Sequence, residues 1–506
     1  MNTIFVTLAV VGALAFAGQA AAQTVPYQSA QRASIGSGLG QSDLPQGGVF
    51  EPRIEAALEY AGNLNLAEDG QPQWDSAGLE VAPGLYASYS TGSVIAAIDY
   101  SLIGRAWEVD DYNDVSHRLA ANGQWLAVPE WFAIRGQATY SDSIIDPRSG
   151  LNYGGLGMFG ISNLSEVAAA SINPIVQHRF SNFEFVGQYR YGRTWYLDEG
   201  KGQPVAGFVT GEQDSRDQSA NVSFGTSDDG SRLAARLFYD WQESEYETAL
   251  PYKFERAGLD AGMQISRTLT LVGDVGKESD VDASSTKGGL DSDFWSAGLR
   301  WAPNDRSSAE ARYGERYFGE SYSFSLNHRS RLLQVDASYS EQPTVETRRL
   351  SLGDFDPGEL PTESPGVDFG RVNSSPYVAK NARVSVSAAG SRTKLGVTGF
   401  QYERDYVRNL RSDETGTGVA FSATRQLASN LSSDFSVSYS DYERAPVTAA
   451  PVASDGTNDY DTQATIRLNR KSGARLTLSG EAGYLTRSGD RDYDGWWVGV
   501  RARYEP

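Results

Sequence analysis

Residues 307–341 decide the fold, and they read SSAEARYGERYFGESYSFSLNHRSRLLQVDASYSE. Successive side chains of a strand point to opposite faces, so Tyr322, Phe324 and Leu326 share one face and the serines between them share the other. The alternation resumes from Leu333 to Tyr339, after a connection of residues 328–331. The stretch therefore predicts a β-hairpin with one apolar and one polar face, either in a sandwich or in the wall of a membrane barrel.

The first residues favour the barrel because they direct the chain to export. Residues 1–22 read MNTIFVTLAVVGALAFAGQAAA, with an apolar run shorter than the ~20 residues that a membrane-spanning helix needs. Ala20 and Ala22 occupy the small-residue positions before a signal-peptide cut. Residues 23–51 are rich in Gln, Ser and Gly, and we expect them to form a flexible periplasmic segment.

Composition narrows the class further. An exported chain of 506 residues with no cysteine has no disulfide framework and no thiol chemistry. It contains 27 Tyr, 20 Phe and 10 Trp, although only 40% of its residues are hydrophobic, as expected when one face of every strand is polar. A net charge of −20 argues against nucleic acid as a partner.

Alternating segments recur along residues 52–506, and they predict a closed antiparallel transmembrane β-barrel of about 18 to 22 strands. The connections between them alternate in length, with short turns expected at the periplasmic rim and long loops at the exterior. The longest connection, residues 344–376, predicts either a plug or lid or a plain exposed loop. The short connections are 91–93, 128–130, 227–231, 328–331, 389–392, 427–429 and 471–473; the long ones are 143–164, 197–214, 277–291, 344–376 and 445–459.

The last strand resembles the aromatic-rich terminal strand that the barrel assembly machinery recognises. Trp496, Val498 and Tyr504 share its apolar face, whereas Arg501 and Arg503 share the other. The chain then ends in Glu505 and Pro506 instead of an aromatic residue. We therefore expect this machinery, outer-membrane lipid and lipopolysaccharide to be partners.

Four stretches resemble the outer-membrane proteins associated with PEP-CTERM/exosortase and exopolysaccharide systems. They are PRIEAALEYAGNLNLAEDG (52–70), VAPGLYASYSTGS (81–93), INPIVQHRFSNFEFVGQYRYG (172–192) and WAPNDRSSAEARYGERYFGESYSFSLNHRSR (301–331). The first departs from the family, which tends to have Tyr-Thr-Asp-Asn where residues 60–63 read Tyr-Ala-Gly-Asn. The resemblance implies an outer-membrane barrel in a polysaccharide-producing envelope, with polysaccharide and periplasmic export components as partners. It implies no catalytic residue.

Enzymatic chemistry has little support in the sequence. The three histidines, His117, His178 and His328, each precede an arginine near a strand end, and no two of them have metal-ligand spacing. GxSxG and HExxH motifs are absent. We predict a protein without catalytic residues, metal or cofactor.

The lumen is where function in a barrel usually resides. Strand parity turns a set of charged residues inward, where guanidinium groups could bind carboxylates or sugar hydroxyls, or could simply pair with acidic residues of the wall. The predicted pore-lining residues are Arg236, Glu310, Arg312, Arg316, Arg383, Arg467, Arg501 and Arg503.

The sequence thus predicts a pore or export-associated conduit linked to exopolysaccharide. Two alternatives remain open. A general diffusion porin would pass small solutes freely, and a scaffold barrel would dock periplasmic partners through residues 23–51.

Overall fold

The computed structural model describes residues 47–144, 164–197, 204–205, 208–209, 214–226, 232–247, 250–281, 289–345, 376–406, 413–445, 456–490 and 492–506. The predicted signal peptide and most of the predicted plug or lid lie outside these residues. The predicted flexible segment ended at residue 51, but strand β1 begins at Gly47 and Gly47 already pairs with Ser90. Residues 47–51 therefore belong to the barrel wall.

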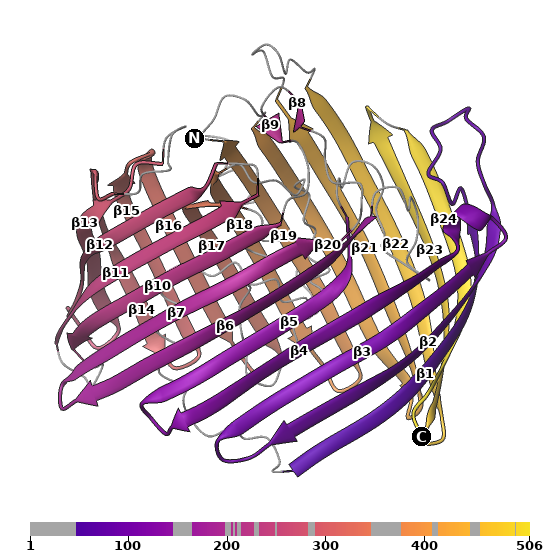
Figure 1. The fold of residues 1–506 in the computed structure, drawn as a ribbon, viewed down its shortest axis with the longest axis horizontal. Helices are drawn as coiled ribbons and strands as arrows, with labels where there is room; N and C mark the ends of the chain where they lie inside the picture. Colours follow the sequence, from indigo (N-terminus) through magenta and orange to yellow (C-terminus); the bar gives the residue numbers. More distant parts are fainter. Residues whose placement is uncertain are drawn as a thin grey trace.

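The predicted closed antiparallel barrel is confirmed, and it has 22 strands in one sheet (Figure 1). The strands are Gly47–Gly62 (β1), Ser76–Ser90 (β2), Val94–Trp107 (β3), Asp114–Val128 (β4), Phe132–Ile144 (β5), Leu164–Phe180 (β6), Phe183–Tyr196 (β7), Ser215–Thr226 (β10), Leu233–Tyr246 (β11), Tyr252–Gln264 (β12), Leu269–Glu278 (β13), Ser292–Asn304 (β14), Ser307–Arg316 (β15), Gly319–Arg329 (β16), Leu333–Thr344 (β17), Tyr377–Ala389 (β18), Thr393–Tyr406 (β19), Glu414–Ala428 (β20), Leu431–Arg444 (β21), Thr457–Ser472 (β22), Leu476–Gly489 (β23) and Tyr493–Tyr504 (β24). Outside this sheet, Pro204–Val205 (β8) pairs with Phe208–Val209 (β9), and a 3-10 helix spans Asp110–Tyr112 (η1).

The first and last strands close the barrel. Strand β1 pairs with β24 from Ile54 opposite Tyr504 to Gly62 opposite Trp496. Both the start of β1 and the end of β24 lie at the rim where the short turns are, as the strand count predicts. We call this the short-turn rim and the opposite one the long-connection rim. At the long-connection rim, β15 joins β16 through residues 317 and 318 alone.

The two faces of the wall differ in chemistry as the alternation predicts. Outward apolar side chains are exposed, as at Leu233 with 61% and Val500 with 61% of their surface accessible. Outward rings pair near both rims: Trp131 stacks on His178 with 3.6 Å between ring centroids, and Trp295 meets Tyr313 at 5.8 Å. An apolar band between aromatic girdles is typical of barrels in a bilayer.

No helix among the described residues has the length and apolar character needed to cross a bilayer. The only helix among them is the three-residue η1.

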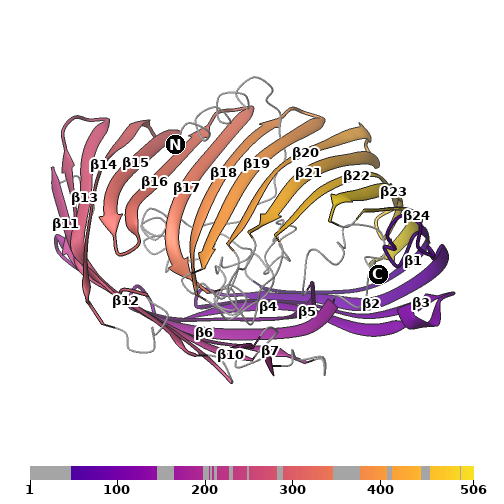
Figure 2. The same ribbon diagram turned by 90° about the horizontal axis from the view of Figure 1, so that it is seen from above.

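The cross-section is flattened (Figure 2). Strands β2 to β7 form a nearly flat wall, β14 to β23 arch over it, and the wall bends sharply around β11–β13 and around β24 and β1. Inward glycines permit the bends because a side chain would collide with the neighbouring strand. A Cβ on Gly314 would lie 2.0 Å from the carbonyl oxygen of Trp295, and one on Gly483 would lie 1.9 Å from the ring of Trp497.

Candidate functional site

The pairing register turns every predicted pore-lining residue toward the lumen. On β15, Ala309, Ala311 and Tyr313 alternate with Glu310 and Arg312, and Tyr313 is exposed outward. The same alternation holds along each of the other strands that carry the set. What the side chains do there differs between two groups of residues.

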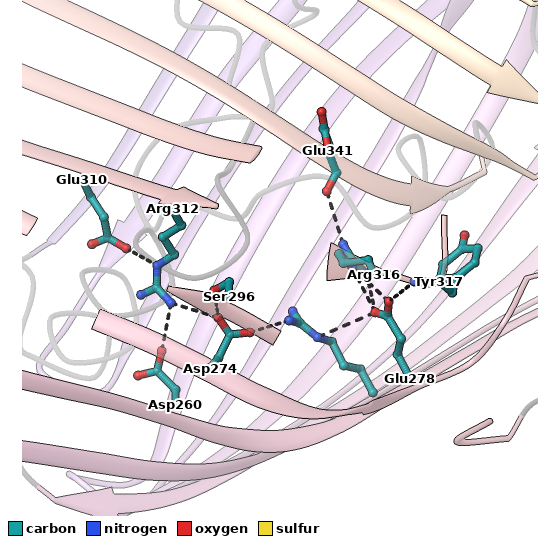
Figure 3. A network of polar contacts seen from close by, with 10 residues as sticks. Asp260, Asp274, Glu278, Ser296, Glu310, Arg312, Arg316, Tyr317 and Glu341 are labelled. Carbon is teal, nitrogen blue, oxygen red and sulfur yellow. Dashed lines mark hydrogen bonds and ion pairs between the residues drawn. The ribbon is translucent and has the colours of Figure 1, made fainter. Parts of the chain in front are cut away.

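The first group lies on β12–β15, where the bend around β11–β13 leads into the arched wall, and we call it the ionic tip (Figure 3). Arg312 of β15 contacts the carboxylates of Glu310 at 2.6 Å, Asp274 at 3.2 Å and Asp260 at 3.4 Å. Adjacent strands lie about 4.8 Å apart, so the three steps from β12 to β15 in a flat sheet would cover roughly 14 Å. The sharp curvature of the wall brings these side chains together. The members of the ionic tip are Arg256, Asp260, Asp274, Glu278, Ser296, Arg300, Glu310, Arg312 and Arg316.

Glu278 is a second centre of contacts in the ionic tip, after Arg312, and none of its side chain is exposed. Its carboxylate accepts hydrogen bonds from Arg316 Nη2 at 2.6 Å and from the backbone N–H of Tyr317 at 3.1 Å. Burial raises the pKa of the Tyr317 phenol. Arg256 links the Arg312 contacts to the Glu278 contacts, since it lies 2.6 Å from Asp274 and 3.9 Å from Glu278.

These contacts make the ionic tip part of the wall. Arg312 is 7% exposed and Asp274 is 2% exposed, and buried charges are tolerated only when they are paired and hydrogen-bonded. Arg312 and Arg316 are therefore occupied by carboxylates of the protein. Sequence reasoning named Glu310, Arg312 and Arg316 but missed Arg256, Asp260, Asp274 and Glu278. The alternation of side chains along residues 252–264 and 269–278 could have identified these residues, because it places them on the inward face.

The second group of predicted residues is more accessible. Arg467 is 45% exposed and contacts Glu481 with its Nε at 2.6 Å. Arg501 and Arg503 are 35% and 45% exposed, and each lies 3.6 Å from Glu55. Arg383 donates to Ser385 at 3.4 Å, and Arg236 has a buried Nε that finds no hydrogen-bond partner among the described residues. Arg467, Arg501 and Arg503 thus keep guanidinium surface that a solute in the lumen could reach.

The inner face of the arched wall is lined by hydroxyl groups, and we call it the hydroxyl wall. Many of these groups are half-buried or exposed, and several hydrogen-bond to neighbouring strands: Ser385 Oγ lies 3.0 Å from Thr398 Oγ1, and Ser479 donates to Asn469 at 2.7 Å. Sequence reasoning saw the alternating serines of residues 321–325 but did not single them out. The hydroxyl wall consists of Ser321, Ser323, Ser325, Ser338, Ser340, Ser385, Ser387, Thr398, Ser422, Thr424, Ser436, Ser438, Ser440, Thr465, Thr477 and Ser479.

The opposite bend, at the closure of the barrel, is apolar. Trp497 is 1% exposed and packs with Trp107 and Leu485 inside the barrel. The β1–β2 connection is tied to this bend because Asn63, at a φ of 55°, donates its side-chain amide to the carbonyl of Asp494 at 2.6 Å. Burial raises the pKa of Tyr112, in the same cluster, to about 12. The predicted assembly residues Trp496, Val498 and Tyr504 lie on the outward face of the same seam.

The histidines lie on the outward face near the rims. His117 Nδ1 lies 2.8 Å from the hydroxyl of Tyr100, and His178 stacks on Trp131. His328 Nδ1 lies 2.8 Å from Ser307 Oγ, a serine–histidine contact that sequence reasoning missed. Among the residues that the structure describes, no carboxylate bonds the His328 ring, so the pair lacks the third member of a hydrolase triad.

The fold thus defines a closed β-barrel with an outward apolar band and a polar interior. Solved structures with a similar fold include OmpT, an outer membrane protein of Vibrio cholerae (11% identity, covering 91% of this chain and 100% of that chain, TM-score 0.33). Two others are from Pseudomonas aeruginosa: the ferric enterobactin receptor PfeA (10%, 91% and 82%, TM-score 0.46) and OccK2 in complex with glucuronate (8%, 90% and 98%, TM-score 0.37). No protein-family model matches the chain, and no curated protein does.

Proposed function

We propose that the protein is an outer-membrane barrel that conducts hydroxyl-rich solutes along the hydroxyl wall. That wall is the observation that carries the proposal. Serine and threonine hydroxyls both donate and accept hydrogen bonds, so they can exchange partners with sugar hydroxyls at little cost in free energy. A lining of this kind would lower the free-energy cost of removing water from a passing sugar, because its hydroxyls replace lost water contacts. It would not bind the sugar tightly, and conduction requires this balance.

The charge arrangement supports the same proposal. The carboxylates and guanidiniums of the ionic tip neutralise one another in the bend. On the arched wall, hydroxyls alternate with charged residues of both signs, among them Asp434 and the Arg467–Glu481 pair. Arg467 is one accessible cation on that wall, and Glu481 partly neutralises it. Lys394 and Lys471 are exposed cations on the same inward face, opposite Thr424 and Thr477. A neutral solute would therefore meet hydroxyls and partly balanced charges there.

We further propose that the physiological solute is an exopolysaccharide and that the barrel belongs to an export system of the PEP-CTERM type. The resemblance of residues 52–70, 81–93, 172–192 and 301–331 to that family supports this assignment. The barrel would then sit in the outer membrane with its short-turn rim toward the periplasm, where it could meet export components.

Liposome swelling tests the conduction. Vesicles that contain the protein should swell in isosmotic solutions of neutral di- and trisaccharides. Ser438→Trp, which adds an indole to the hydroxyl wall, should slow the swelling, whereas Val437→Trp on the outward face of the same strand should not. Equal slowing by the two substitutions would contradict conduction along the hydroxyl wall.

A deletion strain tests the physiological link. Loss of surface polysaccharide without a change in small-solute uptake would support an export conduit. Altered uptake of small solutes with normal polymer would instead identify a general diffusion porin. A failure to localise periplasmic export proteins, together with no swelling in vesicles, would identify a scaffold barrel.

A further inference from the structure

The ladder between β16 and β17 stops halfway up the wall. It runs from Arg329 opposite Gln334 to Phe324 opposite Tyr339 and does not continue toward the long-connection rim. Both strands nevertheless reach that rim, because β16 pairs with β15 up to Gly319 and β17 pairs with β18 up to Thr344. Residues 319–323 and 340–344 therefore face each other across an unzipped segment of wall, which we call the split.

Glu341 of β17 bridges the split through both its side chain and its backbone carbonyl. The Glu341 carboxylate accepts a hydrogen bond from the backbone N–H of Tyr322 at 3.1 Å, and the Glu341 carbonyl accepts one from Arg316 Nη1 at 3.3 Å. Arg316 reaches it from the lumen, where Glu278 anchors the guanidinium (Figure 3). Among the described residues, these are the polar contacts that cross the split, and a side chain thus replaces the missing ladder.

An apolar cluster lies behind the split, on the inner side of the wall. Tyr252, Phe254, Val281 and Val345 are each 3% exposed or less, and Tyr317 packs against them. Tyr317 belongs to the turn that precedes β16, and Val345 follows the end of β17. The cluster therefore lies at the level of the split and adjoins both of its edges.

An interrupted ladder in a membrane barrel has a cost, because lipid offers no hydrogen bonds to unpaired backbone groups. A closed barrel normally leaves no such edge. Here the edge is kept together by Glu341 and by the contact of Tyr317 with the apolar cluster. Loss of the Glu341 carboxylate would remove the Tyr322 contact and leave only the Arg316 bond to the Glu341 carbonyl as the polar bridge that the described residues make across the split.

We propose that the split is a lateral portal through which the acyl chain of an amphipathic molecule passes between the apolar cluster and the membrane, with Glu341 as its latch. The portal does not depend on the conduction of sugars proposed above. The ligand is an amphipathic molecule. Its acyl chain would contact the apolar cluster, and its polar head would lie in the lumen or at the membrane–water interface.

Distances across the split test the latch. The chain has no cysteine, so spin labels can be placed without background. Labels at S323C and S340C probe the split, and labels at S325C and S338C probe an intact rung of the same ladder. We expect a broader distance distribution across the split, widened further by E341A and not by E320A, whose carboxylate accepts hydrogen bonds from tyrosine hydroxyls of β15 and β16. Equally narrow distributions at both positions in every variant would overturn the proposal.

Lipid access tests the portal itself. Protein in vesicles that contain a phospholipid with a diazirine at the end of its acyl chain is irradiated, and cross-linked peptides are identified by mass spectrometry. Cross-links to residues 252–254 should rise about ten-fold in E341A, as expected for the loss of one charge-assisted hydrogen bond. An oxidised S323C/S340C disulfide should abolish them and reduction should restore them, whereas S325C/S338C should have no effect. Heat-modifiable gel mobility verifies that each variant is folded. If lumenal cross-links are absent throughout, or persist in the oxidised S323C/S340C variant, the portal does not exist.

Discussion

Arg312→Ala should destabilise the barrel far more than Arg467→Ala, although both arginines were predicted from sequence to line the pore. Arg312 is 7% exposed and contacts three carboxylates, so its removal leaves negative charges together in the bend. Breaking a buried ion pair costs about 3–5 kcal/mol. Glu310 keeps Arg300 and Asp274 keeps Arg256, so we expect the lower end, about 3 kcal/mol.

Arg467 provides the matched control. It is 45% exposed and has Glu481 as its partner, and exposed pairs contribute about 0–1 kcal/mol. The free energy of unfolding is measured in lipid vesicles by denaturant titration followed by tryptophan fluorescence. Adding Glu310→Gln to Arg312→Ala should recover part of the lost stability, because it removes one of the stranded charges. Equal losses for the two arginine variants, or no recovery by the second substitution, would refute the assignment of the ionic tip to the wall.

Two further predictions concern the seam and the girdle. Gly483→Ala should lower the yield of folded barrel, because its Cβ would lie 1.9 Å from the Trp497 ring, whereas Gly480→Ala on the same strand meets no atom within 4 Å and should fold normally; gel mobility before and after heating distinguishes them. Trp131→Ala removes the ring that stacks on His178 at 3.6 Å and should cost about 1–3 kcal/mol in vesicles, measured by the same denaturant titration; a loss equally large in detergent micelles without a bilayer interface would argue against an interfacial role.

The strands and their faces could be predicted because both depend on local alternation. Residues 307–341 gave a hairpin, its polar face and the inward direction of Arg312, all without knowledge of distant segments. The start of β1 was missed, since Gly47 and Gly48 read as the end of a linker and only pairing with β2 makes them part of a strand.

Long-range geometry was beyond the sequence pattern. Arg312 meets Asp260 across three strand intervals only because the wall bends there, and bending depends on which inward positions of neighbouring strands are glycine. The split was equally hidden, because residues 319–323 (GESYS) and 340–344 (SEQPT) are mostly polar and carry no alternation from which their pairing could be judged. Alternation predicts which way side chains point and not where a ladder ends.

The measurement that tests the central proposal most directly is single-channel conductance of the purified protein in a planar bilayer, with neutral oligosaccharides added to one side. Conduction along the hydroxyl wall predicts a stable conductance that the sugar blocks in a saturable manner, with weaker block in Ser438→Trp than in Val437→Trp. A conductance that is indifferent to sugar, or no conductance at all, would contradict it.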